Sequence, residues 1–372
     1  MENSNLILDG SKILYHQERL NDWLSGKRIA PITIECAITT KCNYKCVFCF
    51  KKCQKVEEMI GLERETILQF LDDAAEIGVK AVSFIGDGEN TCNPWLEEAI
   101  LRGRNNGLDV ALGTNGSLLT THMLQTLLPQ LTYIRFSICA GERDRYAEIH
   151  GCPKDNFDKV CDVIQEAVHI KRDKQLPVTI GLQMVLMPEF GDQIIPLAKL
   201  GAGFGVDYLV IKHCADDEEG NIGVRYDQYI DLYDTLKKAE LFSTNEYSVT
   251  VKLTKIKNGK NRHYKKCYAA PFLVQMSGSG IIAPCAGLFA PKYKRFHLGN
   301  INSQRLIDIW KSEHYWNVMK RLATGREGFN PQTDCPYLCL QHNTNDILWR
   351  IKEEGLKTDK PSNVSPQHIN FV

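Results

Sequence analysis

The stretch ITIECAITTKCNYKCVFCF (residues 32–50) joins an apolar strand pattern to a loop that holds three cysteines. Cys42 and Cys46 are separated by three residues, and Cys46 and Cys49 by two. A structural zinc site needs four protein ligands, and the nearest further candidate is Cys53. Three thiolates from one turn suit three irons of a cubane cluster, which leaves the fourth iron open to another ligand.

The composition is that of a globular protein. Of the 372 residues, 43% are hydrophobic and 24% are charged, and the formal net charge is zero. That balance gives no electrostatic case for a nucleic acid or membrane partner. No apolar run approaches the roughly 20 residues that cross a bilayer, and the N-terminus lacks a secretory signal. We therefore expect a cytoplasmic protein whose 14 cysteines serve metal or redox chemistry rather than disulfides.

Strand and helix patterns alternate between residues 32 and 214. Strands are predicted at 32–38, 80–86, 109–114, 133–139, 178–187 and 208–214, with helices at 62–77, 94–105, 119–128, 155–171 and 190–203. Six strands with intervening helices imply parallel pairing and right-handed crossovers. An open doubly wound sheet and a barrel with fewer than eight repeats both fit this pattern.

The alternation ends after residue 214. A helix (226–240), a strand (249–255), a hairpin around the turn at 277–280 and two helices (304–322 and 343–355) are predicted to follow. A further amphipathic helix is predicted at 10–27. We divide the chain into an N-terminal helical extension (1–30), an α/β core (31–225), a smaller α+β domain (226–358) and a mobile tail (359–372).

The cysteine loop resembles that of the radical S-adenosylmethionine (radical SAM) superfamily, with Phe48 before the last cysteine. IGDGE (85–89), after the second strand, is similar to that family's Gly-Gly-Glu-like motif, although Asp87 stands where a second glycine is common. GTNGS (113–117) and RFSIC (135–139) resemble its later turns. The resemblance covers about residues 32–214 and implies an α/β fold, a partial (β/α)6 TIM-like barrel.

This resemblance also implies a set of site residues. Cys42, Cys46 and Cys49 would hold a [4Fe–4S] cluster whose open iron chelates S-adenosyl-L-methionine, and the cofactor would be lined by Phe48, Gly86, Asp87, Gly88, Glu89, Asn115, Ser137 and Gln183. An electron from flavodoxin or ferredoxin would cleave the cofactor to a 5′-deoxyadenosyl radical, which takes hydrogen from the substrate. A structural zinc knuckle is the alternative for the cysteines, and ordinary barrel-facing polar residues for Ser137 and Gln183.

A second group of cysteines lies in the C-terminal region. Cys267 and Cys285 flank the predicted hairpin, and Cys335 and Cys339 lie in DCPYLC (334–339). Four such cysteines could close a zinc site or hold a fully ligated cluster. The pattern resembles the SPASM/twitch extension of radical SAM enzymes. Because only four cysteines are present here, the resemblance implies the shorter twitch form with one auxiliary [4Fe–4S] cluster.

The reaction is less constrained. Cys214 ends the sixth strand on the same face as Lys212, and its thiol could return hydrogen to a substrate radical, as could Cys139 at the end of the fourth. Buried packing is the alternative for both. We expect oxidation, dehydrogenation or epimerisation of a small sugar- or amino-sugar-like molecule. A peptide- or protein-modifying maturase and a non-catalytic iron–sulfur redox or metal sensor are the alternatives.

Overall fold

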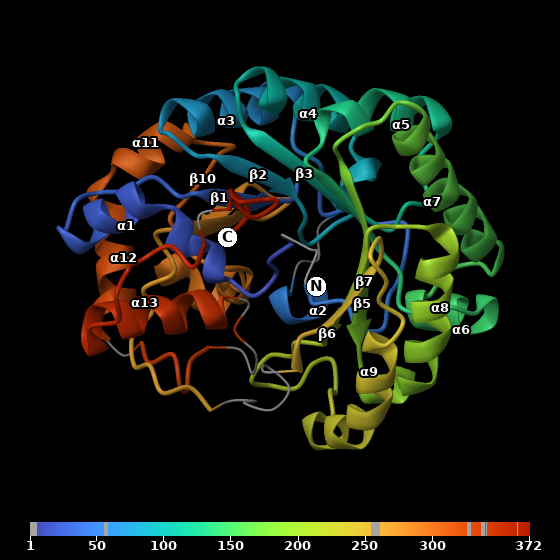
Figure 1. Ribbon diagram of the computed structural model, residues 1–372. Helices are drawn as coiled ribbons and strands as arrows, with labels where there is room; N and C mark the ends of the chain where they lie inside the picture. The colour runs from blue at the N-terminus through green and yellow to red at the C-terminus, as the bar shows by residue number, and fades with distance from the viewer. Residues whose placement is uncertain are drawn as a thin grey trace.

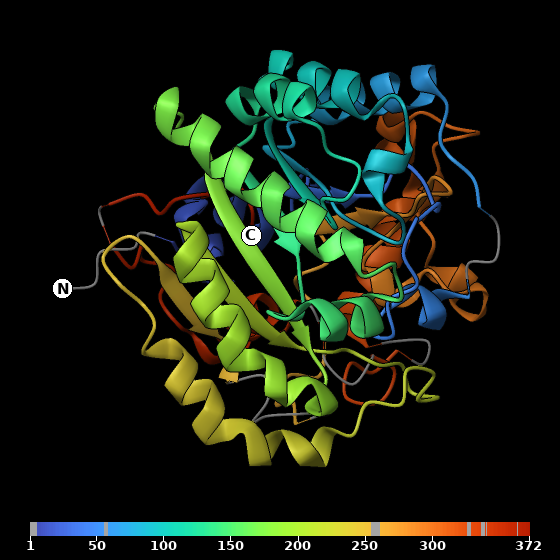
Figure 2. The ribbon, with the colours of Figure 1, turned by 90° about the vertical axis from the view of Figure 1, so that its right-hand side faces the viewer.

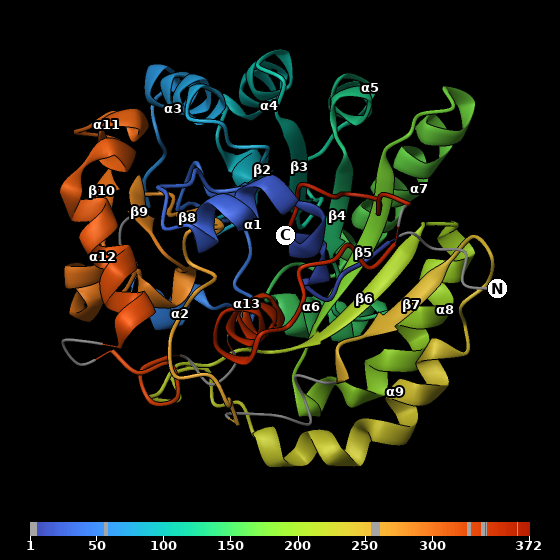
Figure 3. The same cartoon turned by 60° about the vertical axis from the view of Figure 1, so that its left-hand side comes forward.

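The computed structural model describes residues 6–55, 59–253, 261–325, 329–335, 339, 341–362 and 364–372. One curved sheet forms its centre, with helices outside it (Figures 1, 2 and 3). The six predicted strands are present as β1 (Thr33–Cys36), β2 (Ala81–Phe84), β3 (Asp109–Thr114), β4 (Tyr133–Ser137), β5 (Thr179–Leu186) and β6 (Tyr208–His213). They pair in parallel in chain order. The fold is therefore a partial TIM-like barrel, and not an open doubly wound sheet.

Two further parallel strands extend this sheet. β7 (Ser248–Val251) pairs with β6, and β8 (Leu273–Met276) pairs with β1 on the opposite side. The predicted hairpin is confirmed, because β8 turns back into antiparallel β9 (Ile281–Ala283), followed by β10 (Gly299–Asn300). The sheet is thus continuous across the predicted boundary at residue 225. Residues 254 and 255 of the strand predicted at 249–255 lie outside the described residues.

Helices cover the outside of the barrel. Those between the strands are α2 (Lys51–Gln54), α3 (Arg64–Glu76), α4 (Leu96–Asn105), α5 (Thr121–Leu127), α6 (Arg143–His150), α7 (Asp155–Asp173) and α8 (Ile194–Phe204), of which α2 and α6 were not predicted. The others are α1 (Gln17–Leu24), α9 (Tyr233–Glu240), α11 (Leu306–Lys311), α12 (Glu313–Thr324) and α13 (His342–Glu354). The helix predicted at 304–322 is broken at Ser312, whose hydroxyl accepts the Tyr315 backbone N–H at 3.1 Å and caps α12.

Alternation along the strands separates an apolar outer layer from a polar interior. In β1, Ile34 and Cys36 are buried in the main core beneath the helices. Thr33 and Glu35 point the other way, into the barrel, because successive strand residues face opposite sides. The barrel interior is therefore lined in part by polar and charged side chains.

The end of the chain packs against the barrel, so a mobile tail does not describe residues 367–372. His368 Nε2 lies 2.8 Å from the Thr179 hydroxyl, and the Thr33 hydroxyl donates to the Asn370 carbonyl at 2.6 Å. Phe371 is buried against Tyr133, with ring centroids 5.0 Å apart. Burial of an aromatic ring and these hydrogen bonds hold the last residues, QHINFV, although the stretch before them is polar and contains Pro361 and Pro366.

Within the described chain, no helix is both long and apolar enough to cross a bilayer.

Candidate active site

The three-cysteine loop follows β1 at the carboxyl edge of the sheet, where α/β barrels place their chemistry. Cys42, Cys46 and Cys49 are all half-buried. Burial raises the pKa of the Cys46 thiol, and the neighbouring Cys139, Cys49 and Cys42 thiols raise it further. Three sulfurs thus share one small site, and each would have to lose its proton to bind a metal.

The loop is held by the turn that follows β3. Asn43 donates to the Ser117 hydroxyl at 2.7 Å and accepts from the Asn115 amide at 2.9 Å. Ser117 in turn donates to Asn115 Oδ1 at 2.8 Å. The motifs at 41–50 and 113–117, which are far apart in sequence, therefore form one hydrogen-bonded unit.

The turn at residues 85–89 packs directly on the start of the cysteine loop. A Cβ on Gly88 would lie 2.1 Å from the Thr39 carbonyl oxygen, and one on Gly86 would lie 2.5 Å from the Ala37 Cβ. The Glu89 backbone N–H donates to the Lys41 carbonyl at 2.8 Å. Gly86 and Gly88 are required by this close approach, and Gly88 most strictly because backbone atoms surround it.

Glu89 is a buried carboxylate with four internal donors. One oxygen accepts from the Thr91 backbone N–H, the Thr91 hydroxyl and the Thr114 hydroxyl at 3.2, 2.8 and 2.8 Å. The other accepts from the Asn115 backbone N–H at 2.7 Å. Burial raises its pKa, and these donors oppose the rise. The arrangement ties the second and third turns together.

Asp87 differs from Glu89 because only one of its two carboxylate oxygens has a hydrogen-bond partner among the described residues. Oδ1 accepts the Gly278 backbone N–H at 2.8 Å, whereas Oδ2 is buried without a hydrogen-bond partner among the described residues. Burial raises the pKa of this carboxyl. An orphaned acceptor beside the cysteine loop fits the ammonium group of an amino-acid-like cofactor such as S-adenosylmethionine.

The remaining predicted cofactor residues also border the loop or the barrel interior. Phe48 is buried with its ring edge-on to His150, at 5.4 Å between centroids. Ser137 pairs with Gln183 in the register of β4 and β5. Phe136 and Leu182 beside them are in the outer core, so Ser137 and Gln183 face the interior.

The four C-terminal cysteines form a second group. Burial raises the pKa of Cys267 to about 12, and the neighbouring Cys339 thiol also raises it. A hydrogen bond with Cys339 raises the pKa of Cys335. Burial raises the pKa of the Cys285 thiol, and the neighbouring Cys339 and Cys267 thiols raise it further. Four thiols from three separate segments therefore converge, which fits a protein-ligated metal or cluster. The hairpin turn beside this group packs on the first site, since a Cβ on Gly278 would lie 2.3 Å from the Thr39 carbonyl oxygen.

Cys214 and Cys139 are both buried behind the cysteine loop. The Cys214 thiol donates to the Phe48 carbonyl at 3.6 Å and the Ala215 carbonyl at 3.5 Å. The Cys139 sulfur accepts the Val185 backbone N–H at 3.4 Å. These contacts account for both thiols as packed groups, and a hydrogen-donor role for Cys214 stays a prediction.

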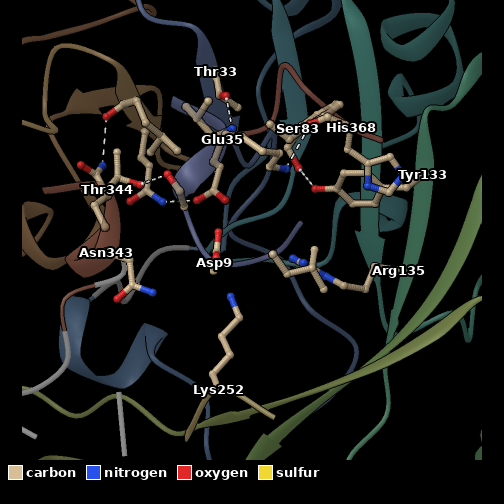
Figure 4. A pocket seen from close by; sticks show the side chains of 18 of the residues that line it. Asp9, Thr33, Glu35, Ser83, Tyr133, Arg135, Lys252, Asn343, Thr344 and His368 are labelled. Atoms are coloured by element: carbon tan, nitrogen blue, oxygen red, sulfur yellow. Dashed lines mark hydrogen bonds between the residues drawn. The ribbon is translucent and has the colours of Figure 1, made fainter. Parts of the chain in front are cut away.

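A polar cavity of about 170 Å³ occupies the barrel interior toward the amino-terminal ends of the strands. Glu35, Arg135, Lys252, Asp9 and Asn343 point into it from different elements (Figure 4). The Gln275 amide donates to the Glu35 carboxylate. Sequence reasoning missed this cavity, although isolated charges in apolar strands, as at Glu35 and Arg135, were the available signal.

Two family models match the chain. The radical SAM superfamily model covers residues 36–200, and an iron–sulfur cluster-binding domain model, SPASM, covers residues 267–339. The two matches coincide with the two groups of cysteines.

Curated relatives and solved structures extend this likeness. The chain is 23% identical to a tungsten-containing aldehyde ferredoxin oxidoreductase cofactor-modifying protein of Pyrococcus furiosus, over 80% of this chain and 85% of that protein. It is 33% identical to an S-adenosylmethionine-dependent nucleotide dehydratase of Flammeovirga pacifica, over 32% and 42%. Streptococcus suis SuiB bound to S-adenosylmethionine has a TM-score of 0.62 at 15% identity, over 82% of this chain and 71% of that one. The protein anSMEcpe with bound AdoMet has a TM-score of 0.56 at 16% identity, over 87% and 93%. At these identities the solved structures show a shared fold.

Proposed function

Because this chain belongs to the radical SAM superfamily and carries a C-terminal SPASM domain, we propose that it is an enzyme acting on a small polar molecule held in the barrel. When bound, the [4Fe–4S] cluster and S-adenosylmethionine supply a 5′-deoxyadenosyl radical that takes a hydrogen atom from the substrate. The observation that carries this proposal is the orphaned, buried Asp87 Oδ2 beside three clustered thiols.

Residue roles follow from the contacts. Cys42, Cys46 and Cys49 would hold the first cluster. Asp87 Oδ2 would accept the cofactor's ammonium group, and Glu89 would orient the surrounding turns through its four hydrogen bonds. Phe48, Asn115, Ser137 and Gln183 would line the cofactor.

Cys267, Cys285, Cys335 and Cys339 would hold an auxiliary [4Fe–4S] cluster that receives an electron from the substrate radical or stabilises the domain. The hairpin turn at Gly278 contacts both Asp87 and the start of the cysteine loop, so the auxiliary domain is anchored at the first site.

The substrate proposal rests on the polar interior of the barrel, of which the described cavity is one part. The lining of that cavity includes carboxylates (Asp9 and Glu35) and cations (Arg135 and Lys252), but it lies toward the amino-terminal ends of the strands, away from the cysteine loop. On the side of the loop, Ser137 and Gln183 face the interior from β4 and β5, and we propose that these polar groups receive the hydroxyl groups of a sugar- or amino-sugar-like molecule. The reaction class is oxidation, dehydrogenation or epimerisation, with Cys214 as the candidate hydrogen donor for the last.

Peptide modification is the second candidate. It is favoured by the fold shared with SuiB bound to its precursor peptide SuiA, with a TM-score of 0.61 at 16% identity.

Anaerobic reconstitution tests the proposal. The chain should bind about eight irons and eight sulfides, as expected for two cubanes, and release 5′-deoxyadenosine when reduced with S-adenosylmethionine. Replacing Cys42, Cys46 and Cys49 by Ala should halve the iron and abolish 5′-deoxyadenosine. Replacing Cys335 and Cys339 should halve the iron but keep the cofactor-dependent change in the remaining cluster's spectrum. A fully loaded protein that forms no 5′-deoxyadenosine would support the sensor alternative instead.

A further inference from the structure

His150 lies behind the cysteine loop, in a segment that no sequence motif marked. It is the last residue of α6 and is fully buried. Its ring stacks on Tyr146 at 4.3 Å between centroids, and the edges of Phe48 and Tyr44 pack around it at 5.4 and 6.0 Å. Aromatic contacts on several sides therefore fix the plane of the imidazole.

Hydrogen bonding determines which ring nitrogen carries the proton. The Cys139 backbone N–H points at His150 Nε2 at 3.0 Å, so Nε2 is the acceptor and carries no hydrogen. A neutral imidazole has one N–H, which must then be on Nδ1. Nδ1 lies 3.4 Å from Cys46 Sγ. The imidazole therefore presents an N–H to the cysteine sulfur.

The other two sulfurs of the loop receive donors of a different kind. Cys42 Sγ accepts the Tyr44 backbone N–H at 3.5 Å, and Cys49 accepts from the Lys51 backbone. Those donors belong to the loop itself and persist under most substitutions. The donor to Cys46 is a side chain from a distant helix, so it can be removed by mutation.

We propose that His150 is a positioning residue that hydrogen-bonds the Cys46 thiolate in the first cluster and raises the reduction potential of that cluster. The inference rests on the proposed ligand role of Cys46. A reduced cluster carries one more negative charge than an oxidised one, and a donor aimed at a ligand sulfur stabilises that extra charge. The dry surroundings of His150 strengthen the effect.

Three variants test this inference. His150→Phe keeps a ring in the aromatic stack and removes the donor. His150→Gln can accept from the Cys139 N–H through its carbonyl oxygen and donate to Sγ through its NH2. Tyr146→Phe is the matched control, because it loses the 3.3 Å hydroxyl contact with Tyr44 and keeps the ring against His150.

The measurement is an EPR-monitored redox titration of the reconstituted protein without substrate. The first cluster is recognised as the one whose signal changes when S-adenosylmethionine is added. His150→Phe should lower the ratio of reduced to oxidised first cluster about tenfold at a fixed poise, which is a 59 mV shift for one electron. His150→Gln should recover most of that loss, and Tyr146→Phe should titrate like the unmodified protein.

A fully loaded His150→Phe protein with an unchanged first-cluster midpoint would overturn the inference. If His150→Phe does not retain iron, His150→Leu replaces it with the same expected shift, because its apolar side chain offers Cys46 Sγ no hydrogen-bond donor. An unmodified protein that assembles no S-adenosylmethionine-responsive cluster would refute the proposed function, which is a distinct outcome.

Discussion

Replacing Glu89 by Gln separates a structural carboxylate from a cofactor ligand. The change keeps the side chain's size but converts one acceptor oxygen into an NH2 donor. If the new NH2 group replaces the oxygen that accepts the Asn115 backbone N–H at 2.7 Å, two N–H donors face each other at that position. The opposite orientation sets the NH2 against the three donors from Thr91 and Thr114. Every orientation therefore leaves at least one buried N–H unpaired.

The expected loss follows from that count. One buried unpaired donor costs about 1–3 kcal/mol, and the remaining bonds lose the strength that a charged acceptor gives. Burial of the charged carboxylate is unfavourable and raises the pKa of Glu89. Glutamine is neutral, so the substitution removes that cost and offsets part of the lost hydrogen bonding. We expect a net loss of about 2–4 kcal/mol in the free energy of unfolding, which lowers Tm by roughly 3–5 °C in a chain of this size.

Calorimetry of the reconstituted and the iron-free protein is the assay, with Glu246→Gln at an exposed carboxylate as the control. Both forms of Glu89→Gln should melt early, and Glu246→Gln should melt like the unmodified chain. An unchanged Tm together with weakened S-adenosylmethionine binding would refute the reasoning, and would make Glu89 a direct ligand.

Three further changes probe other parts of the molecule. Asp87→Asn should weaken S-adenosylmethionine binding at least tenfold in equilibrium dialysis, because the acceptor Oδ2, which has no partner among the described residues, is replaced by an NH2 group. Its Tm should be nearly unchanged, because Oδ1 can still accept the Gly278 N–H. Binding equal to that of the unmodified protein would contradict this role. Burial lowers the pKa of Lys12 to about 7, with Asp9 opposing the shift and Arg135 adding to it. Between pH 7 and about pH 10 the Lys12 amine is therefore protonated in the unfolded chain and neutral in the folded one, so the free energy of unfolding should rise with pH over that range. Lys12→Met should flatten that rise in urea midpoints measured at several pH values, and an equal slope in both proteins would exclude Lys12 as its source. Phe371→Ala should lower the free energy of unfolding by about 2–4 kcal/mol and therefore lower Tm, because it leaves a cavity beside Tyr133. An unchanged Tm would indicate that the chain end is mobile in solution.

The C-terminal strands illustrate what local patterns miss. β8 completes the sheet by pairing Thr33 with Leu273 and Glu35 with Gln275, across more than 200 residues of chain. Nothing in the sequence near 273 indicates that partner, since a strand pattern shows that a strand forms but not what it pairs with. The predicted hairpin, by contrast, is confirmed, because β8 and β9 are neighbours in sequence and their pairing is local.

The paired carboxylates of the motif at 85–89 show the same limit within the site. Sequence placed both Asp87 and Glu89 beside the cysteine loop. Only the surrounding donors distinguish them. Glu89 accepts hydrogen bonds from Thr91, Thr114 and Asn115, whereas Asp87 Oδ2 has no partner in the described part of the chain. The donors from Thr114 and Asn115 come from the turn after β3, so they are absent from the local pattern around Glu89.

By itself the sequence determined the spacing of Cys42, Cys46 and Cys49, the six alternating strands and the family that they indicate. These are local features, set by the geometry of one loop and by strand and helix periods. The tertiary structure alone decided the eight-strand parallel order, the buried chain end, the polar cavity and the contact of His150 with Cys46. Each of these depends on groups that meet only after distant segments fold together, and so on packing that no single stretch of sequence encodes.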